Sequence, residues 1–202
     1  MATHSGHKLL ELRQLLDLGG TRLLSLDELG VVGEPVEDGL TFETNARIKA
    51  RHASRATGLP ALADDSGIEV DALGGLPGVR TRRYAGPNAT DADNNAKLMR
   101  ELEGVRAGQR GARYVCVLAV ALPDAAAPGG LRLETRRGTS RGRITFEPRG
   151  SGGFGYDPLF EPARERPGGR TFAQYGPAEK HAISHRGRAA RRMSRLLRDL
   201  GF

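Results

Sequence analysis

Two adjacent carboxylates offer the clearest chemistry in this sequence. Asp64 and Asp65 follow the apolar run Leu59–Ala63, which predicts a buried strand, so we expect both side chains to meet water at the end of that strand. Adjacent carboxylates in such a position can hold a hard divalent cation such as Mg²⁺. A solvated turn is the competing interpretation, because Asp, Ser and Gly are also common in turns.

A second candidate site is the segment Thr3–Lys8, which precedes the first predicted helix. Apolar residues then recur with a helical period, at Leu9, Leu12, Leu15 and Leu16. We expect the helix to start just after Gly6, so that backbone N–H groups, the helix dipole and the Lys8 ammonium converge on phosphate. The P-loop spacing G-x-x-x-x-G-K-S/T is absent, so an ordinary helix cap is the alternative.

The lysines form a third set of candidates. Of the 31 basic residues only four are lysine, at Lys8, Lys49, Lys97 and Lys180. In a chain so rich in arginine, a retained lysine indicates a place where a compact ammonium cannot be replaced by a flat guanidinium. Lys97 falls in a polar helix and is expected at the surface, and the other three are candidate anion ligands.

The glycine-rich loop Gly150–Asp157 is a candidate purine pocket. It ends in Phe154, Gly155, Tyr156 and Asp157. Aromatic faces can stack on a base, and a neighbouring carboxylate can accept hydrogen bonds from the base or the ribose. A β-turn whose rings join the core is the alternative.

The last predicted helix, Ser184–Leu200, combines two kinds of basic residue. Lys180 and the start of the helix, with His185 and Arg186, can point donors into a cleft. Further along, arginines lie opposite the apolar face of the helix, at Arg191, Arg192, Arg195 and Arg198. We interpret these as a solvated face, with a nucleic-acid-binding stripe as the alternative.

The remaining pattern predicts a mixed α/β fold. A short strand is expected at Arg22–Leu26, and helices at Thr41–Ala56 and Asp91–Leu102, the second with a capping signal at Thr90. The strand-like runs that follow look like a meander, at Tyr114–Leu122, Leu131–Thr135 and Arg143–Phe146. No repeat or long linker divides the chain, so residues 1–202 are expected to form a single domain.

Composition limits the class of protein. The 202 residues are 38% hydrophobic, enough for a sizeable core, and the longest apolar stretch is far too short to span a bilayer. The single cysteine, Cys116, excludes an internal disulfide, and no histidine has zinc-ligand spacing. A chain without a signal-peptide core is expected in the cytoplasm, away from membranes. The net charge of +7 and the pI near 10.2 favour polyanionic partners.

Three segments closely resemble the inosine/xanthosine triphosphate pyrophosphatase family. They are Thr41–Gly86, which contains LPALADDSG, Pro148–Phe160 (PRGSGGFGYDPLF) and Ala178–Ala189 (AEKHAISHRGRA). The resemblance runs in order over nearly the whole chain. It implies a hydrolase that converts dITP, ITP and XTP to the monophosphate and pyrophosphate. It also implies a curved mixed central sheet with flanking helices, two lobes around a deep nucleotide cleft, Mg²⁺ dependence and a homodimer.

The resemblance also implies roles for individual residues. Asp65 matches the catalytic carboxylate that binds Mg²⁺ and serves as general base, and Glu37 matches a second acidic metal contact. Substrate contacts are implied at Thr3, His4, Ser5, Gly6, His7, Lys8, Lys49, Ser66, Phe154, Gly155, Tyr156, Asp157, Lys180, His185 and Arg186. Within this set Lys8 and Lys49 would bind the triphosphate. Lys180, His185 and Arg186 would read the 6-oxo edge of the purine.

The sequence departs from the family at a few positions. Ser5 stands where the family has Asn, and Thr44 stands where it usually has Glu. Arg82 replaces a small residue, and by comparison with the family we expect no apolar strand before the first motif. These departures concern the phosphate loop, the start of the second helix and, for Arg82, a surface loop.

Two rival functions stay open at this level. A basic nucleic-acid-binding module is suggested by the pI, but it has no use for Asp64 and Asp65, which repel phosphate unless a metal intervenes. A Maf-like nucleotide pyrophosphatase is a second alternative, against which the FGYD and SHRGR segments argue. The sequence therefore favours a purine nucleoside triphosphate as substrate and no stable nucleic-acid partner.

Overall fold

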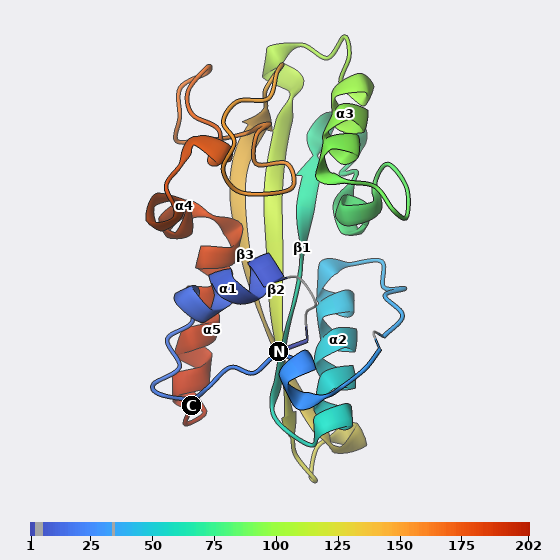
Figure 1. The fold of residues 1–202 in the computed structure, drawn as a ribbon, viewed down its shortest axis with the longest axis vertical. Coiled ribbons are helices and arrows are strands. Elements are labelled where there is room, and N and C mark those ends of the chain that lie inside the picture. Colours follow the sequence, from blue (N-terminus) through green and yellow to red (C-terminus); the bar gives the residue numbers. More distant parts are fainter. Residues whose placement is uncertain (3–5, 34) are drawn as a thin grey trace. The chain divides into compact units, whose positions relative to one another are not determined.

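A four-stranded sheet organises the chain, in the order β1-β2-β3-β4 (Figure 1). The computed structural model describes residues 1–2, 6–33 and 35–202, and of residues 6–8 the backbone alone. The strands are β1 (Ala61–Val70), β2 (Gly111–Pro123), β3 (Leu131–Ile144) and β4 (Phe160–Pro162). β3 pairs antiparallel with β4, whereas Ala2 makes a parallel bridge to Ala63 of β1. The predicted α/β class is confirmed.

Five α-helices accompany the sheet. They are α1 (Gly6–Leu15), α2 (Phe42–Thr57), α3 (Asp91–Glu101), α4 (Pro177–Ile183) and α5 (His185–Asp199). Thr41 caps α2 by accepting a hydrogen bond from the Thr44 amide, and a capping box between Thr90 and Asp93 starts α3. The predicted helices are confirmed to within two residues at each end, and α4 is an additional short helix.

The strand predictions need three corrections. β1 does not end before Asp64 and Asp65 but continues through both to Val70. The runs Leu131–Thr135 and Arg143–Phe146 belong largely to one strand, β3. Arg22–Leu26 forms no strand. In that segment the Leu23 carbonyl accepts a hydrogen bond from the Arg13 side chain, and the Leu24 carbonyl accepts one from the Met1 ammonium. These two donors take the place of the backbone N–H groups that a neighbouring strand would supply.

The chain divides into two compact units that alternate along the sequence. The first comprises Met1–Asp65, Cys116–Gly138 and Arg186–Phe202, and the second comprises Ser66–Val115 and Thr139–His185. Strands β1, β2 and β3 each pass from one unit to the other. Each unit is described by itself below, and the expected nucleotide cleft and single domain stay predictions.

Each unit has its own hydrophobic core. In the first unit, α1 and α5 pack on β2 through the fully buried Leu12, Leu118 and Met193. In the second unit, aromatic rings dominate: Tyr114 and Phe160 have centroids 4.7 Å apart, and Phe160 and Phe172 have centroids 4.9 Å apart. Burial of large rings and aliphatic side chains is the main stabilising contribution in both cores.

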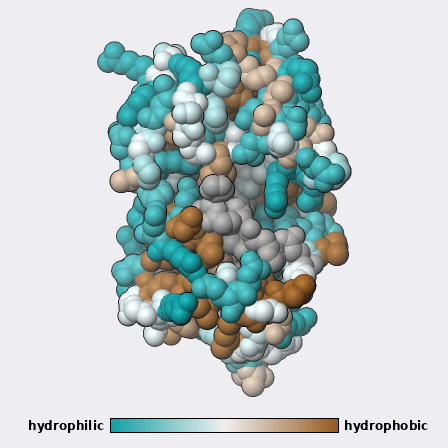
Figure 2. Space-filling model, viewed as in Figure 1, coloured by the Kyte–Doolittle hydropathy of each residue, from teal (hydrophilic) through white to brown (hydrophobic). Residues whose placement is uncertain are grey.

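One face of the molecule is mainly polar. Hydrophilic residues cover most of the face shown in Figure 2, with hydrophobic residues in smaller groups. Among the described residues, no helix has the length and apolar character that crossing a bilayer requires.

The close approach of β3 and β4 generates a stability prediction. A Cβ on Gly142 would lie 2.3 Å from the Glu161 carbonyl oxygen and 2.6 Å from the Phe160 ring. We expect Gly142→Ala to lower the free energy of unfolding by about 1 to 3 kcal/mol, because the two backbones must separate. Urea unfolding measures this loss. Gly108→Ala is the control, since a Cβ there meets nothing within 4 Å, and equal losses in both variants would contradict the prediction.

Candidate active site

Glu37 and Asp65 converge on one ammonium group in the first unit. Lys49, on α2, places its Nζ 2.9 Å from Asp65 Oδ1 and 3.1 Å from Glu37 Oε2. The Lys49 and Asp65 side chains are only 12% and 11% exposed. The helical position of Lys49, one turn beyond Asn45, directs both side chains at β1. A buried cation therefore joins the two carboxylates that were expected to hold a metal.

Asn45 connects the same cluster to the turn that carries Glu37. Its Nδ2 lies 3.5 Å from Asp65 Oδ2, and its Oδ1 accepts a hydrogen bond from the Gly39 amide at 2.9 Å. A Cβ on Gly39 would lie 2.5 Å from that Oδ1, so only glycine permits this approach. Sequence reasoning missed Asn45. The signal available in the sequence was an amide side chain about one helical turn before Lys49.

The charge of Lys49 follows from its surroundings. Burial by itself lowers the pKa of Lys49, but the negative charges of Asp65, Asp64 and Glu37 outweigh burial. The pKa is consequently raised above its ordinary value, so the group stays an ammonium at neutral pH.

Asp64 and Asp65 serve different clusters. Successive side chains in a strand point to opposite faces. Asp65 contacts Lys49, whereas Asp64 Oδ2 lies 3.8 Å from Arg186 Nη2. The expectation that the pair meets water together at a strand end is therefore wrong, because each carboxylate is neutralised inside the strand by its own cation.

Arg186 is buried at the start of α5. Its Nη1 donates to Glu11 of α1, a second residue that sequence reasoning missed. Burial lowers the pKa of Arg186, but Asp64, Glu11 and Cys116 outweigh it and raise the pKa above the ordinary arginine value. The structure thus groups Arg186 with the acidic residues of the first unit.

The residues fit a magnesium ion in one limited sense. Glu37 and Asp65 already direct carboxylate oxygens at a single cationic centre, the Lys49 Nζ. Mg²⁺ is commonly bound by one or two carboxylates together with substrate phosphates and waters. No group of three or more His, Cys, Asp or Glu side chains suited to a metal occurs among the described residues. Two carboxylates plus a triphosphate therefore remain a chemically adequate donor set.

Asp157 organises the candidate base-binding residues of the second unit. Its Oδ2 accepts hydrogen bonds from Lys180 Nζ at 2.6 Å and from the Phe154 amide at 2.9 Å. A Cβ on Gly153 would lie 2.1 Å from this oxygen, and the φ of +72° there also favours glycine. Asp157 thereby fixes the lysine and the loop at one carboxylate.

The two aromatic residues of this loop differ in whether their rings can contact a purine base. Lys180 Nζ lies 4.9 Å from the centroid of the half-buried Phe154 ring. Tyr156 is buried in the core and donates its hydroxyl to the Thr81 carbonyl at 2.8 Å. Phe154 can therefore offer a face to a base, whereas Tyr156 fills the core, as the alternative interpretation of the loop expected.

The other predicted residues of this unit are placed as follows. His185 stacks on Tyr114, with centroids 4.5 Å apart and planes 6° from parallel. The Gly155 amide donates to Asp91 at 2.6 Å, and Ser66 is half-buried in β1. Lys97 lies partly exposed beside Glu101, but its Nζ also donates to the Tyr84 carbonyl at 2.8 Å and lies over the Tyr84 ring, so it is less solvated than expected.

The phosphate-loop prediction lies mainly outside the described structure. Thr3, His4 and Ser5 fall outside the described residues, and of Gly6, His7 and Lys8 only the helical backbone is described. The start of α1 at Gly6 is confirmed, and the roles of the six residues stay predictions.

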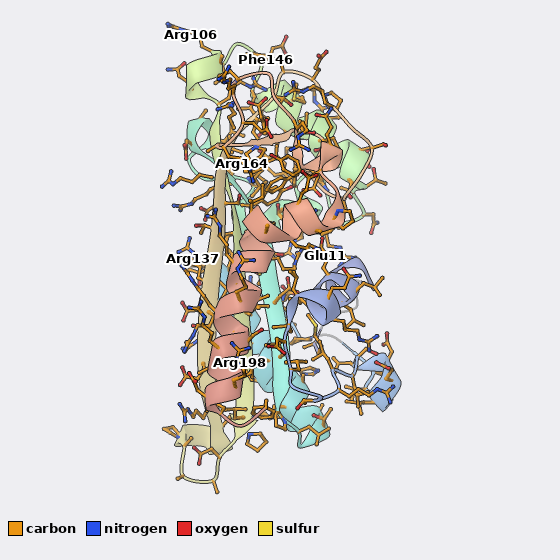
Figure 3. All side chains as sticks on the ribbon, turned by 90° about the vertical axis from the view of Figure 1, so that its left-hand side faces the viewer. Glu11, Arg106, Arg137, Phe146, Arg164 and Arg198 are labelled. Atoms are coloured by element: carbon orange, nitrogen blue, oxygen red, sulfur yellow. The ribbon has the colours of Figure 1, made fainter. Side chains whose placement is uncertain are left out.

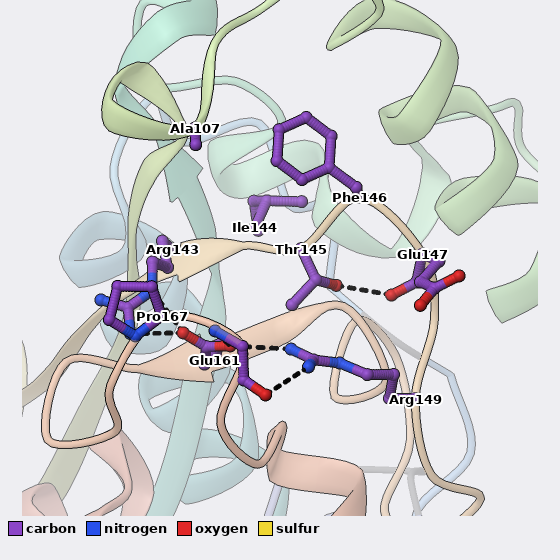
Figure 4. A pocket seen from close by; sticks show the side chains of 10 residues that line it. Ala107, Arg143, Ile144, Thr145, Phe146, Glu147, Arg149, Glu161 and Pro167 are labelled. Atoms are coloured by element: carbon purple, nitrogen blue, oxygen red, sulfur yellow. Dashed lines mark hydrogen bonds and ion pairs between the residues drawn. The ribbon is translucent and has the colours of Figure 1, made fainter.

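A separate cavity of about 200 Å³ lies in the second unit (Figure 4). Its lining includes the buried Glu161, which accepts a hydrogen bond from Arg149 Nη2 at 2.7 Å and forms an ion pair with Arg143. Phe146 and Ile144 supply apolar wall. None of the predicted site residues lines this cavity.

Comparisons with known proteins agree with the resemblance seen in the motifs. The sequence matches the model of the Ham1 family over residues 1–196. A dITP/XTP pyrophosphatase of Geobacter sulfurreducens is 49% identical over 189 residues, covering 94% of this chain and 90% of that protein. One of Methylococcus capsulatus is 47% identical over 201 residues, covering 99% and 96%. The solved structure of a HAM1 protein from Coxiella burnetii has a TM-score of 0.85 at 42% identity, covering 98% and 96%.

The Lys49 cluster predicts a pH-dependent contribution to stability. We expect Lys49→Met to lower the free energy of unfolding by about 3 kcal/mol at pH 7, because it leaves two carboxylates without their cation. Since the folded pKa of Lys49 is raised, its contribution is complete below the ordinary lysine value of 10.5 and declines as pH rises above it. Urea unfolding of wild type and variant at pH 7, 9 and 11 measures the shrinking difference.

Lys97→Met is the matched control. Lys97 Nζ lies 3.7 Å from Glu101 in a partly exposed pair and donates one hydrogen bond to the Tyr84 carbonyl, so its loss should cost about 1 kcal/mol. Similar losses for both lysines would contradict the structural role of Lys49.

Proposed function

The chain belongs to the Ham1 family, and from this membership we propose that it hydrolyses dITP, ITP and XTP to the monophosphate and pyrophosphate. The relatives named dITP/XTP pyrophosphatase support the reaction class. The observation in the structure that supports it best is the buried Asp65 carboxylate between Lys49 and Asn45. These relatives do not favour the two alternatives, a Maf-like enzyme and a protein whose principal function is to bind nucleic acid.

Hydrolysis at the α-phosphorus demands positioning and charge neutralisation more than covalent help from the protein. When bound, Mg²⁺ would neutralise phosphate oxygens and polarise the reacting phosphate. Glu37 and Asp65 are the residues that would hold it. Asp65 also offers a carboxylate oxygen that can take the proton of the attacking water.

Lys49 supplies a fixed positive charge for the triphosphate. Its ammonium donates one hydrogen bond to Glu37 and one to Asp65. A substrate oxygen can share this ammonium without a large movement, because the cation is already desolvated and oriented by two carboxylates. We assign the same triphosphate-binding role to Lys8 and to residues 3–7, and a contact with the nucleotide to Ser66.

The second unit supplies groups suited to a purine. Phe154 can stack on the base, and Lys180 and His185 can donate hydrogen bonds to a 6-oxo group. Asp157 holds Lys180 in place, with Gly155 and Tyr156 shaping the loop. The 6-amino group of adenine would leave such donors unpaired, which costs about 1 to 3 kcal/mol for a buried donor. Arg186 is assigned to the same selectivity, and its contacts with Glu11 and Asp64 also suit a positioning role beside Asp65.

The cellular setting is part of the proposal. We assign Mg²⁺ as the cofactor, the cytoplasm as the location and a homodimer as the working form. The buried and single Cys116 supports a reducing compartment. Nearly fully exposed apolar side chains at Val32 and Leu40 support a surface that a second copy would cover.

Asp65→Asn tests the assigned base and metal ligand. The amide keeps the shape but removes the charge, so we expect pyrophosphate release from ITP with Mg²⁺ to fall by at least about 100-fold. Asp124→Asn, at the half-buried position directly after β2, should retain full activity. Near-normal release by Asp65→Asn, or equal release with and without Mg²⁺ in the wild type, would overturn the assignment.

Base discrimination tests the second half of the proposal. We expect the wild type to release pyrophosphate from ITP and XTP in preference to ATP and GTP. His185→Ala and Arg186→Ala should lower kcat/KM for ITP more than for ATP, which compresses the ratio between them. An equal loss on both substrates would limit the residue to a structural or positioning role. No variant effect on any triphosphate would exclude it from the site.

A further inference from the structure

A row of exposed arginines on α5 has no part in the proposed reaction. Arg188, Arg191, Arg192 and Arg195 are exposed and follow one another at intervals of one, three or four residues. Because a helix turns every 3.6 residues, these four share one side of α5. The opposite side carries the buried Ala189, Met193 and Leu196. We call Arg188, Arg191, Arg192 and Arg195 the arginine stripe.

The stripe lacks the charge pattern of the other helices. α2 pairs Glu43 with Arg47 at 3.3 Å, and α3 pairs Lys97 with Glu101 at 3.7 Å, both four residues apart. α5 has one carboxylate, Asp199, at its last position. Like charges three or four residues apart destabilise a helix. Within α5 itself, Arg195 is the one stripe residue with an acidic residue at this spacing, namely Asp199 four positions further on.

Strand β3 adds another arginine to this surface. Arg192 Nη1 donates a hydrogen bond of 2.5 Å to the backbone carbonyl of Arg137, which brings α5 and β3 together. Figure 3 shows Arg137 beside α5, with Arg198 further along that helix. Arg198 forms an ion pair with Asp17 at 2.6 Å. The guanidinium groups of Arg137 and Arg195 have no ion pair within the described part of the chain.

We propose that the arginine stripe together with Arg137 binds the phosphate backbone of nucleic acid without sequence preference. Guanidinium groups match phosphate oxygens with two parallel hydrogen bonds. Arg188 and Arg195 are about 10 Å apart along the helix axis, a length over which one DNA strand presents about three phosphates. The spacing of the arginines in the stripe therefore matches the spacing of the phosphates along one DNA strand.

The surroundings favour a duplex backbone over other polyanions. The apolar side chains of α5 are buried in the core, so the stripe offers nothing to insert into a lipid bilayer. It also contains no aromatic residue on which single-stranded bases could stack. The contact is expected to be weak and salt-dependent, so it is compatible with the expectation from the sequence that the chain has no stable nucleic-acid partner. It does not depend on the proposed reaction.

Fluorescence anisotropy of a labelled 20-base-pair duplex with the full chain tests the proposal. Neutralising about four phosphates should weaken binding roughly 100-fold between 50 and 200 mM salt. For the double variant Arg192→Gln/Arg195→Gln, the affinity at 50 mM salt should fall at least about 10-fold. The negative slope of log K against log salt should become shallower by about 2. Arg137→Gln, outside α5, should lower the slope by about 1.

The matched control is Arg51→Gln/Arg55→Gln, which removes the same charge from exposed positions of α2. It should weaken duplex binding less than about threefold. An equal loss in both double variants would reduce the effect to net charge and overturn the proposal, as would salt-independent binding. Tighter binding to phosphatidylserine vesicles than to the duplex would assign the surface to membranes instead. Pyrophosphate release should be unchanged in all of these variants.

Discussion

The compensation of buried carboxylates by buried cations is the constraint on which the candidate site depends. An unpaired carboxylate inside a strand would cost several kcal/mol, so Asp64 and Asp65 can be buried in β1 only because Arg186 and Lys49 accompany them. Neither cation lies near the carboxylates in the sequence. One comes from the second helix and the other from the last, which ties distant segments of the first unit to one strand.

The same principle organises the second unit at Asp157. Its carboxylate takes hydrogen bonds from Lys180 and from the backbone of its own loop, so the loop conformation and the lysine position are set together. Close packing reinforces this arrangement, because Gly153 allows an approach to Asp157 that any side chain would block, as Gly39 does for Asn45 in the first unit. Sites held this firmly suit a reaction that needs orientation and charge more than covalent chemistry.

The basic residues discussed above fall into a buried, ion-paired group and an exposed group. Three lysines stand out in the sequence as candidate anion ligands. Two of them, Lys49 and Lys180, form buried ion pairs in the structure. Arg186 is the one buried arginine of α5, whereas the stripe on the other side of that helix faces solvent. A single helix thereby carries a charge locked into the interior and a separate charged surface, and the two can be altered independently.

The sequence by itself determined the class of fold, the capped helices and the identity of the chemical groups, because helical periodicity, capping and residue type are local properties. It also picked out Asp65, Lys49 and Lys180 from their types and scarcity. The tertiary structure decided that β1 runs through Asp64 and Asp65, that Arg186 joins Asp64 and Glu11, and that Asn45 links Asp65 to the Glu37 turn. It also decided that two predicted strands are one. These outcomes depend on which cation or neighbouring strand satisfies a buried polar group, and that partner lies tens to more than a hundred residues away in the chain.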